Sequence, residues 1–571
     1  MQQRTGFDQQ KLGTLEDISG HLQKLPSRQR DLQEEEKNSG CLKDLRLTNP
    51  EDDMKCIEDS KDLLLHESFI WILSHPCFTE WMDDKVSQLL WIKGDPGKGK
   101  TMLLIGIIKE LSRISHKPSP LSFFFCQATD AKLNNATVVL RGLVYQLLAQ
   151  QPSLVSHLCK EYDTAGLKLF EGVNAFTSMS RIISNMLHDP ELNQVYLVVD
   201  ALDECQLGLD QLLNFINETS AHPACQVRWL VSSRNQPSIE EYLCSGERKI
   251  QLDLEQDTES QVFKAVGVYI DHKASELAQL KQYQSDLEAE VRDYLHLNSS
   301  GTFLWVALVC KELEGTRRWR TRETLKSFPS GLQPFYQRMF DQVHNQRDIK
   351  VSVLCKQVLA ASTLAYRPIH LKELIAMTCL PEDVTSDQDD LKDVVNTCGS
   401  FLIVRDETIY FVHQSAKDYL VESASAELFP HGHAPAHHII VSQSLESMSR
   451  ILRRNIYCLQ HPGFCITDAQ PPLEDPLAPI RYACVHWVDH LHEMGSHSGM
   501  FLNDNGMVDS FFREHLLHWL EGLSLIRSMS SSVSAIAKLT NMVRVSHSFP
   551  QLSYTNVNLF RLCLKGLDFL N

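Results

Sequence analysis

The sequence lacks the features that would direct the chain into or across a membrane. No apolar run is long enough to span a bilayer, and the first residues, MQQRTGFDQQKLG, contain no apolar signal core. The 16 cysteines are scattered, without a C-x-x-C pair or a zinc-finger spacing. We therefore predict a cytoplasmic protein without a membrane span, whose cysteines are reduced and mostly buried.

An excess of basic residues is also missing. The 55 Lys and Arg residues face 72 Asp and Glu residues, which gives a formal net charge of −17. A protein that mainly binds nucleic acid usually carries a basic face, so we predict no nucleic-acid partner and attribute the charge to solubility. A chain of 571 residues with 43% hydrophobic residues is globular but too long for one ordinary core, so we expect several domains.

The most informative stretch of the chain is a glycine-rich turn between an apolar strand pattern and an apolar helix pattern. The strand is predicted at residues 89–92, and the helix follows the turn. The turn matches G-x-x-x-x-G-K-[ST] in full, which is the P-loop pattern of nucleotide-binding proteins. Its residues are Gly94, Asp95, Pro96, Gly97, Lys98, Gly99, Lys100 and Thr101.

Each part of this turn has a predicted role toward a nucleotide. Glycines let the backbone curl so that its N–H groups point at phosphate oxygens, and the helix N-terminus adds partial positive charge. Lys100 is predicted to reach the terminal phosphates, and Thr101 to ligate Mg²⁺. The alternative is a chance Gly/Lys turn, which the strand and helix patterns on either side disfavour.

Strand and helix signals alternate after the turn. The first three strand runs are largely apolar rather than alternating, so both faces of the sheet should be covered. Helical patterns occur between them, as at residues 137–148 and 209–216. We predict an α/β domain with a parallel, doubly wound sheet. Its strands are expected at residues 89–92, 121–125, 195–199, 227–232 and 249–252.

Acidic residues follow the third predicted strand. Asp200 comes at its carboxyl end, where open α/β sheets bind ligands, and is predicted to help Thr101 hold Mg²⁺ through water. Asp203 and Glu204 follow one turn later, and Glu204 is the preferred candidate to orient or deprotonate an attacking water. The alternative for both is a solvated helix start, which favours acids.

Arg234 follows the fourth predicted strand, residues 227–232. We predict that it contacts the γ-phosphate and reports its loss. The alternative is a surface arginine that closes a strand.

The rest of the chain is predicted to be mainly helical. Helices followed by a hairpin, at residues 401–404 and 409–412, suggest a winged helix, but that segment has no basic cluster for phosphates. His431, His433, His437 and His438 lack the spacing of a tetrahedral metal site, so we interpret them as exposed histidines. The predicted domains are a polar, partly disordered or helical segment 1–62, a P-loop NTPase domain 63–257 with lead-in helices, a helical domain 258–345, a winged-helix-like domain 346–425 and a C-terminal helical region 426–571.

The acids of the Asp-Ala-Leu-Asp-Glu run, residues 200–204, resemble the NACHT type of P-loop NTPase. Within that type, the chain resembles the fungal STAND proteins of the heterokaryon-incompatibility group over roughly residues 41 to 571. The similar stretches are LLWIKGDPGKGKTML (89–103), LSFFFCQATD (121–130), LNNATVVLRGL (133–143), VDALDEC (199–205), VSSRN (231–235), FVHQSAKDYL (411–420) and HLLHWLEGLSL (515–525).

This resemblance implies a signalling switch with a winged helix that serves as a nucleotide-dependent latch. Such a switch binds and slowly hydrolyses ATP or GTP with Mg²⁺, is closed with NDP and self-associates with NTP. Family members usually add an effector domain and ligand-sensing repeats, which are not recognised here. The chain is therefore expected to be a truncated member, a pared-down member, or one that works with effector or sensor proteins in trans. The alternatives are a nucleotide-binding scaffold that barely hydrolyses, and a metabolic kinase, for which we find no acceptor-site pattern.

Two residues depend on the resemblance alone. In related switch proteins a Pro after a Gly contacts the adenine, but here Phe303 stands at the similar position after Gly301 and Thr302. His413 resembles the winged-helix histidine that contacts the β-phosphate of a bound diphosphate. Its alternative is a hydrogen-bonded histidine at a strand end.

Overall fold

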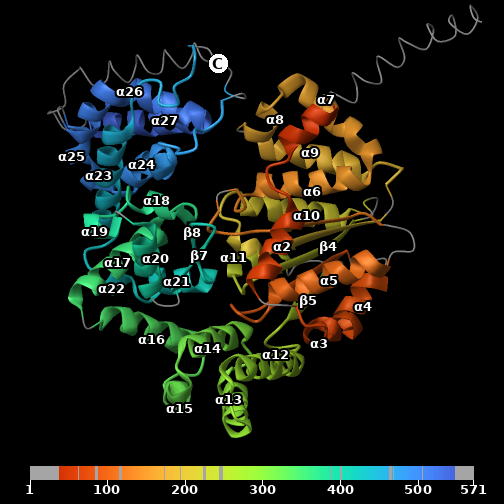
Figure 1. Ribbon diagram of the computed structural model, residues 1–571. Helices are drawn as coiled ribbons and strands as arrows, with labels where there is room; N and C mark the ends of the chain where they lie inside the picture. Colours follow the sequence, from red (N-terminus) through yellow and green to blue (C-terminus); the bar gives the residue numbers. More distant parts are fainter. Residues whose placement is uncertain are drawn as a thin grey trace, which may run out of the picture. The chain divides into compact units, whose positions relative to one another are not determined.

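The computed structural model describes residues 38–546, apart from residues 62–63, 84–87, 115–118, 131, 173, 193, 223–224, 226, 244–248, 347, 386, 399–400, 462–463, 465, 467–468 and 504–505. The described chain divides into two compact units, which are treated separately (Figure 1). The first comprises the described part of Met1–Ser275 together with Ser300–Leu304, and the second comprises Glu276–Ser299 and the described part of Trp305–Asn571. Most of the predicted polar N-terminal segment lies outside the described residues.

The first unit is built around a five-stranded sheet in the order β2-β3-β4-β1-β5. All four strand pairs are parallel, so the carboxyl ends of the strands lie at one edge of the sheet. The five predicted strands and their parallel arrangement are confirmed. Their bounds are β1 (Leu89–Lys93), β2 (Leu121–Phe125), β3 (Val195–Asp200), β4 (Val227–Ser233) and β5 (Lys249–Asp253).

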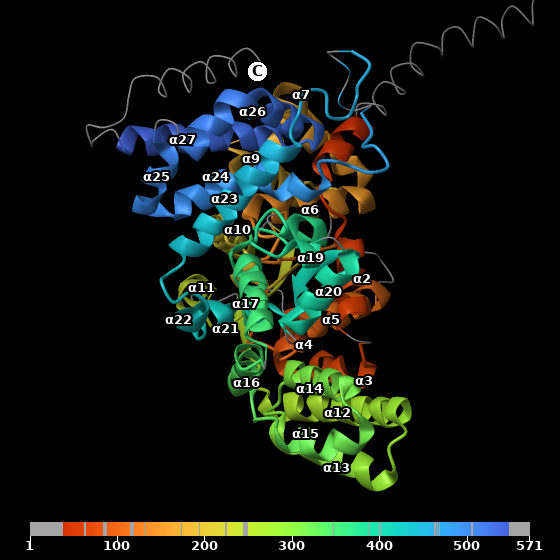
Figure 2. The same cartoon turned by 60° about the vertical axis from the view of Figure 1, so that its left-hand side comes forward.

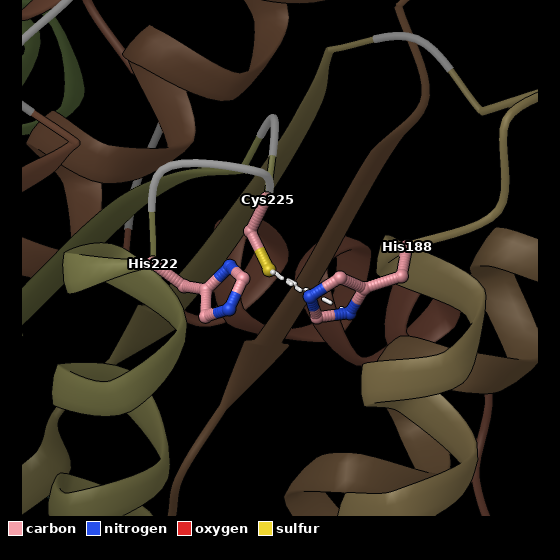
Figure 3. Close-up of side chains that lie close together, drawn as sticks. All are labelled: His188, His222 and Cys225. Carbon is pink, nitrogen blue, oxygen red and sulfur yellow. Dashed lines mark hydrogen bonds between the residues drawn. The ribbon is translucent and has the colours of Figure 1, made fainter.

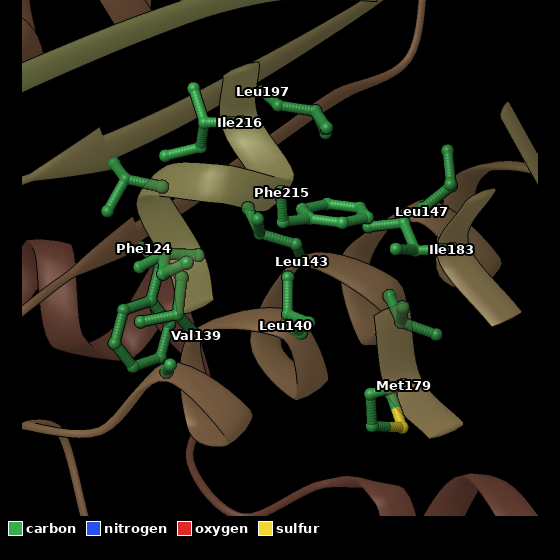
Figure 4. Packing of buried hydrophobic residues seen from close by; sticks show 14 of the residues in the cluster. Phe124, Val139, Leu140, Leu143, Leu147, Met179, Ile183, Leu197, Phe215 and Ile216 are labelled. Carbon is green, nitrogen blue, oxygen red and sulfur yellow. The ribbon is translucent and has the colours of Figure 1, made fainter. Parts of the chain in front are cut away.

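Helices cover both faces of this sheet, because the apolar side chains of each strand alternate between the faces. On one face, α6 (Ala136–Gln150), α9 (Ala175–Leu187) and α10 (Leu209–Ala221) pack on Leu197 and Trp229 of the strands in one large core (Figure 4). α5 (Lys100–Ile114) packs on the other face (Figure 1). The predicted doubly wound architecture is therefore confirmed.

The chain before β1 belongs to the same core. Residues 38–45 are helical and α2 (Pro50–Ser60) follows. Cys41 and Leu45 are fully buried in the large core, and Arg141 of α6 donates from Nε to the Leu45 carbonyl at 3.1 Å. The predicted boundary at residue 62 stays a prediction, but residues before it already contribute to the packing of this unit.

The predicted lead-in helices are confirmed as α3 (His66–Phe69), the short 3₁₀ helix η1 (Ile70–Ser74) and α4 (Pro76–Asp83). Phe69 packs directly on Gly106 of α5, where a Cβ would lie 2.4 Å from the Phe69 ring. A side chain at position 106 would thus separate this lead-in layer from α5.

Helices predicted after the sheet are confirmed as α12 (Glu259–Lys281), α13 (Ser285–Asn298), α14 (Phe303–Gly315) and α16 (Leu332–His344). α17 (Ile349–Leu364) and α20 (Gln388–Thr397) precede the predicted hairpin, which is confirmed as antiparallel β7 (Leu402–Arg405) and β8 (Thr408–Phe411). Its turn residues Asp406 and Glu407 have positive φ values, and β6 (Ile369–His370) pairs with β8. These elements fit the outline of a winged helix, which itself stays a prediction.

The last described helices form a bundle around Trp487 and Trp519 (Figure 2). Trp519 donates from Nε1 to the Cys484 carbonyl at 2.8 Å. The mostly helical character predicted for this part is confirmed. Among the described residues, no helix has the length and apolarity needed to cross a membrane. α21 (Gln414–Glu422) follows β8 and does not contribute to this bundle. The helices of the bundle are α23 (Ala434–Ile451), α24 (Arg481–Glu493), α25 (Gly499–Leu502), α26 (Met507–Leu525) and α27 (Met529–Ser546).

Candidate nucleotide-binding site

The glycine-rich loop, residues 94–99, connects the carboxyl end of β1 to the first residue of α5. Gly97 and Gly99 have φ values of 81° and 85°, which side chains other than glycine rarely adopt. The Gly94 N–H donates to the Ser233 carbonyl at the end of β4, at 3.3 Å. The loop is therefore curled and held at the edge of the sheet where parallel α/β folds bind ligands.

The Lys100 side chain lies within this curl. Its Nζ donates to the Gly94 and Asp95 carbonyls, at 2.5 and 3.0 Å. Burial lowers the pKa of Lys100, while the carboxylates of Asp203 and Asp200 oppose this shift. Thr101 is half-buried in the first turn of the same helix.

Glu255, just after β5, supports the loop from the neighbouring strand. Its Oε1 accepts from the Asp95 N–H at 2.8 Å, and burial raises the pKa of its carboxyl group. Its Oε2 is buried without a hydrogen-bond partner among the described residues. Glu255 was not among the predicted site residues, although an acid after the fifth strand was the available signal. A Cβ at Gly94 would be crowded, because it would lie 3.1 Å from Leu254 Cβ.

The segment Ser300–Leu304 lies against the other end of the loop. Lys98 Nζ donates to the Ser300 carbonyl at 3.0 Å. The Phe303 ring covers Gly99, where a Cβ would lie 2.9 Å from Phe303 Cδ2, and the Tyr269 ring is 5.6 Å away between centroids. Phe303 therefore replaces the expected proline with an aromatic ring that touches the loop.

Asp200 ends β3 with a buried carboxylate, 2% exposed. Ser232 of β4 donates from Oγ to Asp200 Oδ1 at 2.5 Å and accepts from the Ala201 N–H at 2.9 Å. Ala201 has a left-handed φ of 56°, an uncommon conformation that turns the chain sharply after the strand. No role was predicted for Ser232, and a polar residue near the carboxyl end of a predicted strand was the signal for it.

The structure brings together the two predicted residues Asp203 and Arg234. Arg234 donates from Nε to Asp203 Oδ2 and from its backbone N–H to Oδ1, both at 3.0 Å. The Asp203 side chain is 4% exposed, so the solvated helix start considered for it is wrong. Burial raises the pKa of Asp203, whereas Arg234 and Lys100 counteract this shift.

Glu204 is held beside the end of β2. Its Oε2 accepts from the Ala128 N–H at 3.0 Å. Burial, together with the Asp203 carboxylate, raises the pKa of Glu204 to about 7. A carboxyl group that titrates near neutral pH is suited to take a proton from water. The oxygen donors of Thr101 and Asp200 are of the type that Mg²⁺ prefers.

His413 belongs to the second unit, where it caps α21. Its Nδ1 accepts from the Ser415 N–H at 3.1 Å and lies 2.8 Å from Ser415 Oγ. This local bonding agrees with the alternative of a hydrogen-bonded histidine at a strand end. Its contact with a diphosphate stays a prediction.

The family model described as Nephrocystin 3, N-terminal, matches residues 67–234, which run from α3 to Arg234. The chain is also 45% identical, over 525 residues, to the vegetative incompatibility protein HET-E-1 of Podospora anserina. The resemblance to fungal incompatibility proteins is confirmed. The alignment covers 89% of this chain but 38% of HET-E-1, so the chain spans less than half the length of this relative.

Two solved structures are similar at low level. The structure of C. elegans PCH-2 gives a TM-score of 0.25 at 14% identity and covers 48% of this chain and 68% of that one. The structure of Drosophila ORC bound to DNA gives a TM-score of 0.27 at 12% identity and covers 68% of this chain and 92% of that one. Because both TM-scores are below 0.5, the fold assignment depends on the strand order and registers described above.

Proposed function

We propose that the chain is a nucleotide-dependent signalling switch of the fungal incompatibility type, which binds and slowly hydrolyses ATP or GTP. The observation that carries this proposal is the curled loop at the carboxyl edge of the sheet, with Lys100 inside it and the acids that follow β3, Glu204 among them, at the same edge. The loop backbone and the start of α5 would bind the phosphates. The other P-loop residues, Asp95 to Gly99, would shape that cradle.

Lys100 is proposed to exchange its hydrogen-bond partners when a nucleotide binds. In the described structure its ammonium donates to the Gly94 and Asp95 carbonyls, and a bound nucleotide would offer phosphate oxygens instead. Charge-assisted bonds to phosphate are stronger than bonds to neutral carbonyls, so the exchange favours binding. Thr101 and Asp200 would hold Mg²⁺, which supplies charge neutralisation at the phosphates.

Glu204 is the proposed base for the attacking water, because its raised pKa lets it accept a proton near neutral pH. Asp203 is proposed to support the site by holding Arg234, whose guanidinium can then reach the γ-phosphate. Phe303 and Tyr269 are proposed to contact the base or ribose in place of the usual proline. This contact would set the choice between ATP and GTP.

The switch is proposed to be closed with NDP and to self-associate with NTP, with His413 of the winged helix as the latch. Effector or sensor proteins would act in trans in the cytoplasm, without a nucleic-acid partner. The second candidate is a scaffold that holds nucleotide without hydrolysing it. The hydrogen bonds from Arg234 to Asp203 favour the scaffold, because they occupy both carboxylate oxygens of Asp203. Of the two acids that could activate the attacking water, only Glu204 is then available.

Single-turnover hydrolysis by the purified chain, with Mg²⁺ and either ATP or GTP, separates the two candidates. The switch predicts slow phosphate release and a larger particle mass by light scattering in a non-hydrolysable NTP than in NDP. Binding without phosphate release would favour the scaffold. Absence of binding to either nucleotide would overturn the assignment of the loop.

A further inference from the structure

Two histidines and a cysteine meet at the edge of the sheet opposite the glycine-rich loop. His188 directly follows α9, and His222 directly follows α10. Cys225 precedes β4, so it lies at the amino-terminal edge of the parallel sheet, whereas the loop follows the carboxyl end of β1. Figure 3 shows the Cys225 sulfur between the two imidazole rings.

The three side chains are close enough to share one metal ion. Their ligand atoms all lie within 4.8 Å of one another, and His188 Nε2 is 3.4 Å from Cys225 Sγ. With zinc bonds of about 2.0–2.1 Å to nitrogen and about 2.3 Å to sulfur, a tetrahedral site separates N and S ligands by about 3.6 Å. The His188–Cys225 pair therefore already has the spacing of two zinc ligands.

The hydrogen bonds around the cluster orient the His188 ring and hold the backbone of the other two candidate ligands. His188 Nδ1 is 2.7 Å from the Ser184 carbonyl, to which only an N–H can donate, so the neutral ring presents its Nε2 lone pair toward the sulfur. The Cys225 carbonyl accepts from Gln88 Nε2 at 3.1 Å, and the Cys225 N–H donates to the His222 carbonyl at 3.1 Å. These bonds fix the backbone that carries two of the three ligands.

We propose that His188, His222 and Cys225 form a zinc site with three protein ligands and a water molecule in the fourth position. Two nitrogen ligands and one sulfur ligand suit Zn²⁺ better than Mg²⁺ or Ca²⁺, which prefer oxygen. Both histidines are exposed, so an ion and its water can enter, while Cys225 is 1% exposed. On binding, the Cys225 S–H bond breaks, the sulfur electron pair forms the bond to Zn²⁺, and the proton leaves to solvent.

Such an ion would join the end of α9, the end of α10 and the start of β4. It would stabilise the edge of the sheet that is away from the proposed nucleotide site. Because the ion displaces the thiol proton of Cys225, binding should strengthen as pH rises. Because the ligands lie at the opposite edge, the inference is independent of the proposed nucleotide chemistry.

Cobalt is the probe for this site, because a thiolate bound to Co²⁺ absorbs in the near ultraviolet. The full chain, stripped with a chelator and titrated with Co²⁺ in the absence of nucleotide, should develop this band with about one ion per chain, and Zn²⁺ should abolish it. Cys225→Ser should remove the band. His188→Asn and His222→Asn should each weaken Co²⁺ binding by at least about 100-fold, since changes to residues that only support a ligand already cost about 10–100-fold.

The controls are Cys379→Ser and His431→Asn, which change the same residue types at exposed positions outside the cluster and should leave the band intact. If Cys225→Ser fails to fold, the two surface histidine variants decide the question, with circular dichroism to confirm folding. A missing band in the parent chain would overturn the proposal. A band that persists in both folded histidine variants, or metal analysis that finds copper retained in preference to zinc, would also overturn it.

Discussion

The two edges of the sheet in the first unit offer different kinds of ligand atoms. At the carboxyl edge, the glycine-rich loop, the half-buried Lys100 and the acids Asp200, Asp203 and Glu204 present N–H and oxygen groups. At the amino edge, imidazole nitrogens and a thiol meet between two helix ends. The first set suits phosphate and Mg²⁺, and the second suits Zn²⁺. The two edges of one parallel sheet thus offer different ligand atoms, since each edge gathers residues from different loops.

The largest expected effect tests the chemistry of the carboxyl edge. Glu204→Gln keeps the shape of the side chain but removes the base, so single-turnover hydrolysis should fall about 10²-fold or more while nucleotide binding persists. The Co²⁺ titration of the amino edge should not change. Unaltered hydrolysis in this variant would mean that Asp203 or water alone carries the step.

Removing the cation of the loop should have the next largest effect. Lys100→Ala takes away the charge that faces the phosphates, so nucleotide affinity should fall at least about tenfold, or about 1.4 kcal/mol. Isothermal titration with NDP measures the change. Equal affinity of Lys100→Ala and the parent would contradict the P-loop assignment.

The pH dependence of hydrolysis sharpens the assignment of Glu204. The pKa of this carboxyl group is raised to about 7, so it is protonated and inactive as a base below that pH and becomes active above it. The single-turnover rate should therefore rise about tenfold from pH 6 to pH 8 and then level off. In Glu204→Gln the residual rate should lose this rise, and a parental rate that is flat over the same range would argue against Glu204.

The smallest expected effect is that of substituting His413. This substitution distinguishes a role as a nucleotide-dependent latch from a role as a local helix cap. His413→Ala removes the bond to the Ser415 N–H, which costs about 1 kcal/mol of stability. If His413 also holds the β-phosphate, NDP release by stopped-flow should speed up about tenfold or more, and light scattering should show larger assemblies.

His413→Asn is the matched control for the latch, because asparagine caps helices well but places no imidazole at the phosphate. The latch predicts fast NDP release in both variants. If His413→Asn releases NDP at the rate of the parent chain and restores its stability, His413 acts only as a helix cap.

Much of the first unit could be predicted from local patterns. All five strands were predicted: four predictions ended one residue before the observed strand, as at β1, and the fifth, β2, matched it, because buried parallel strands leave a continuous apolar signal. The loop between β1 and α5 was equally predictable, since glycines at positive φ are a local requirement. Contacts between strands could not be predicted in this way, because no local sequence pattern specifies which strands are neighbours in the sheet. The hydrogen bond from Ser232 to Asp200 is an example.

The sequence by itself determined the strands, the glycine-rich loop and the identity of the acids, because each depends on residues that are neighbours in the chain. The tertiary structure decided the rest. Burial raised the pKa of Glu204, and Arg234 met Asp203 because β3 and β4 are adjacent. It also brought His188 to Cys225 from 37 residues away, since the ends of α9 and α10 converge at the start of β4. Desolvation and the meeting of distant loops depend on which surfaces the whole chain covers, and no local sequence pattern carries that information.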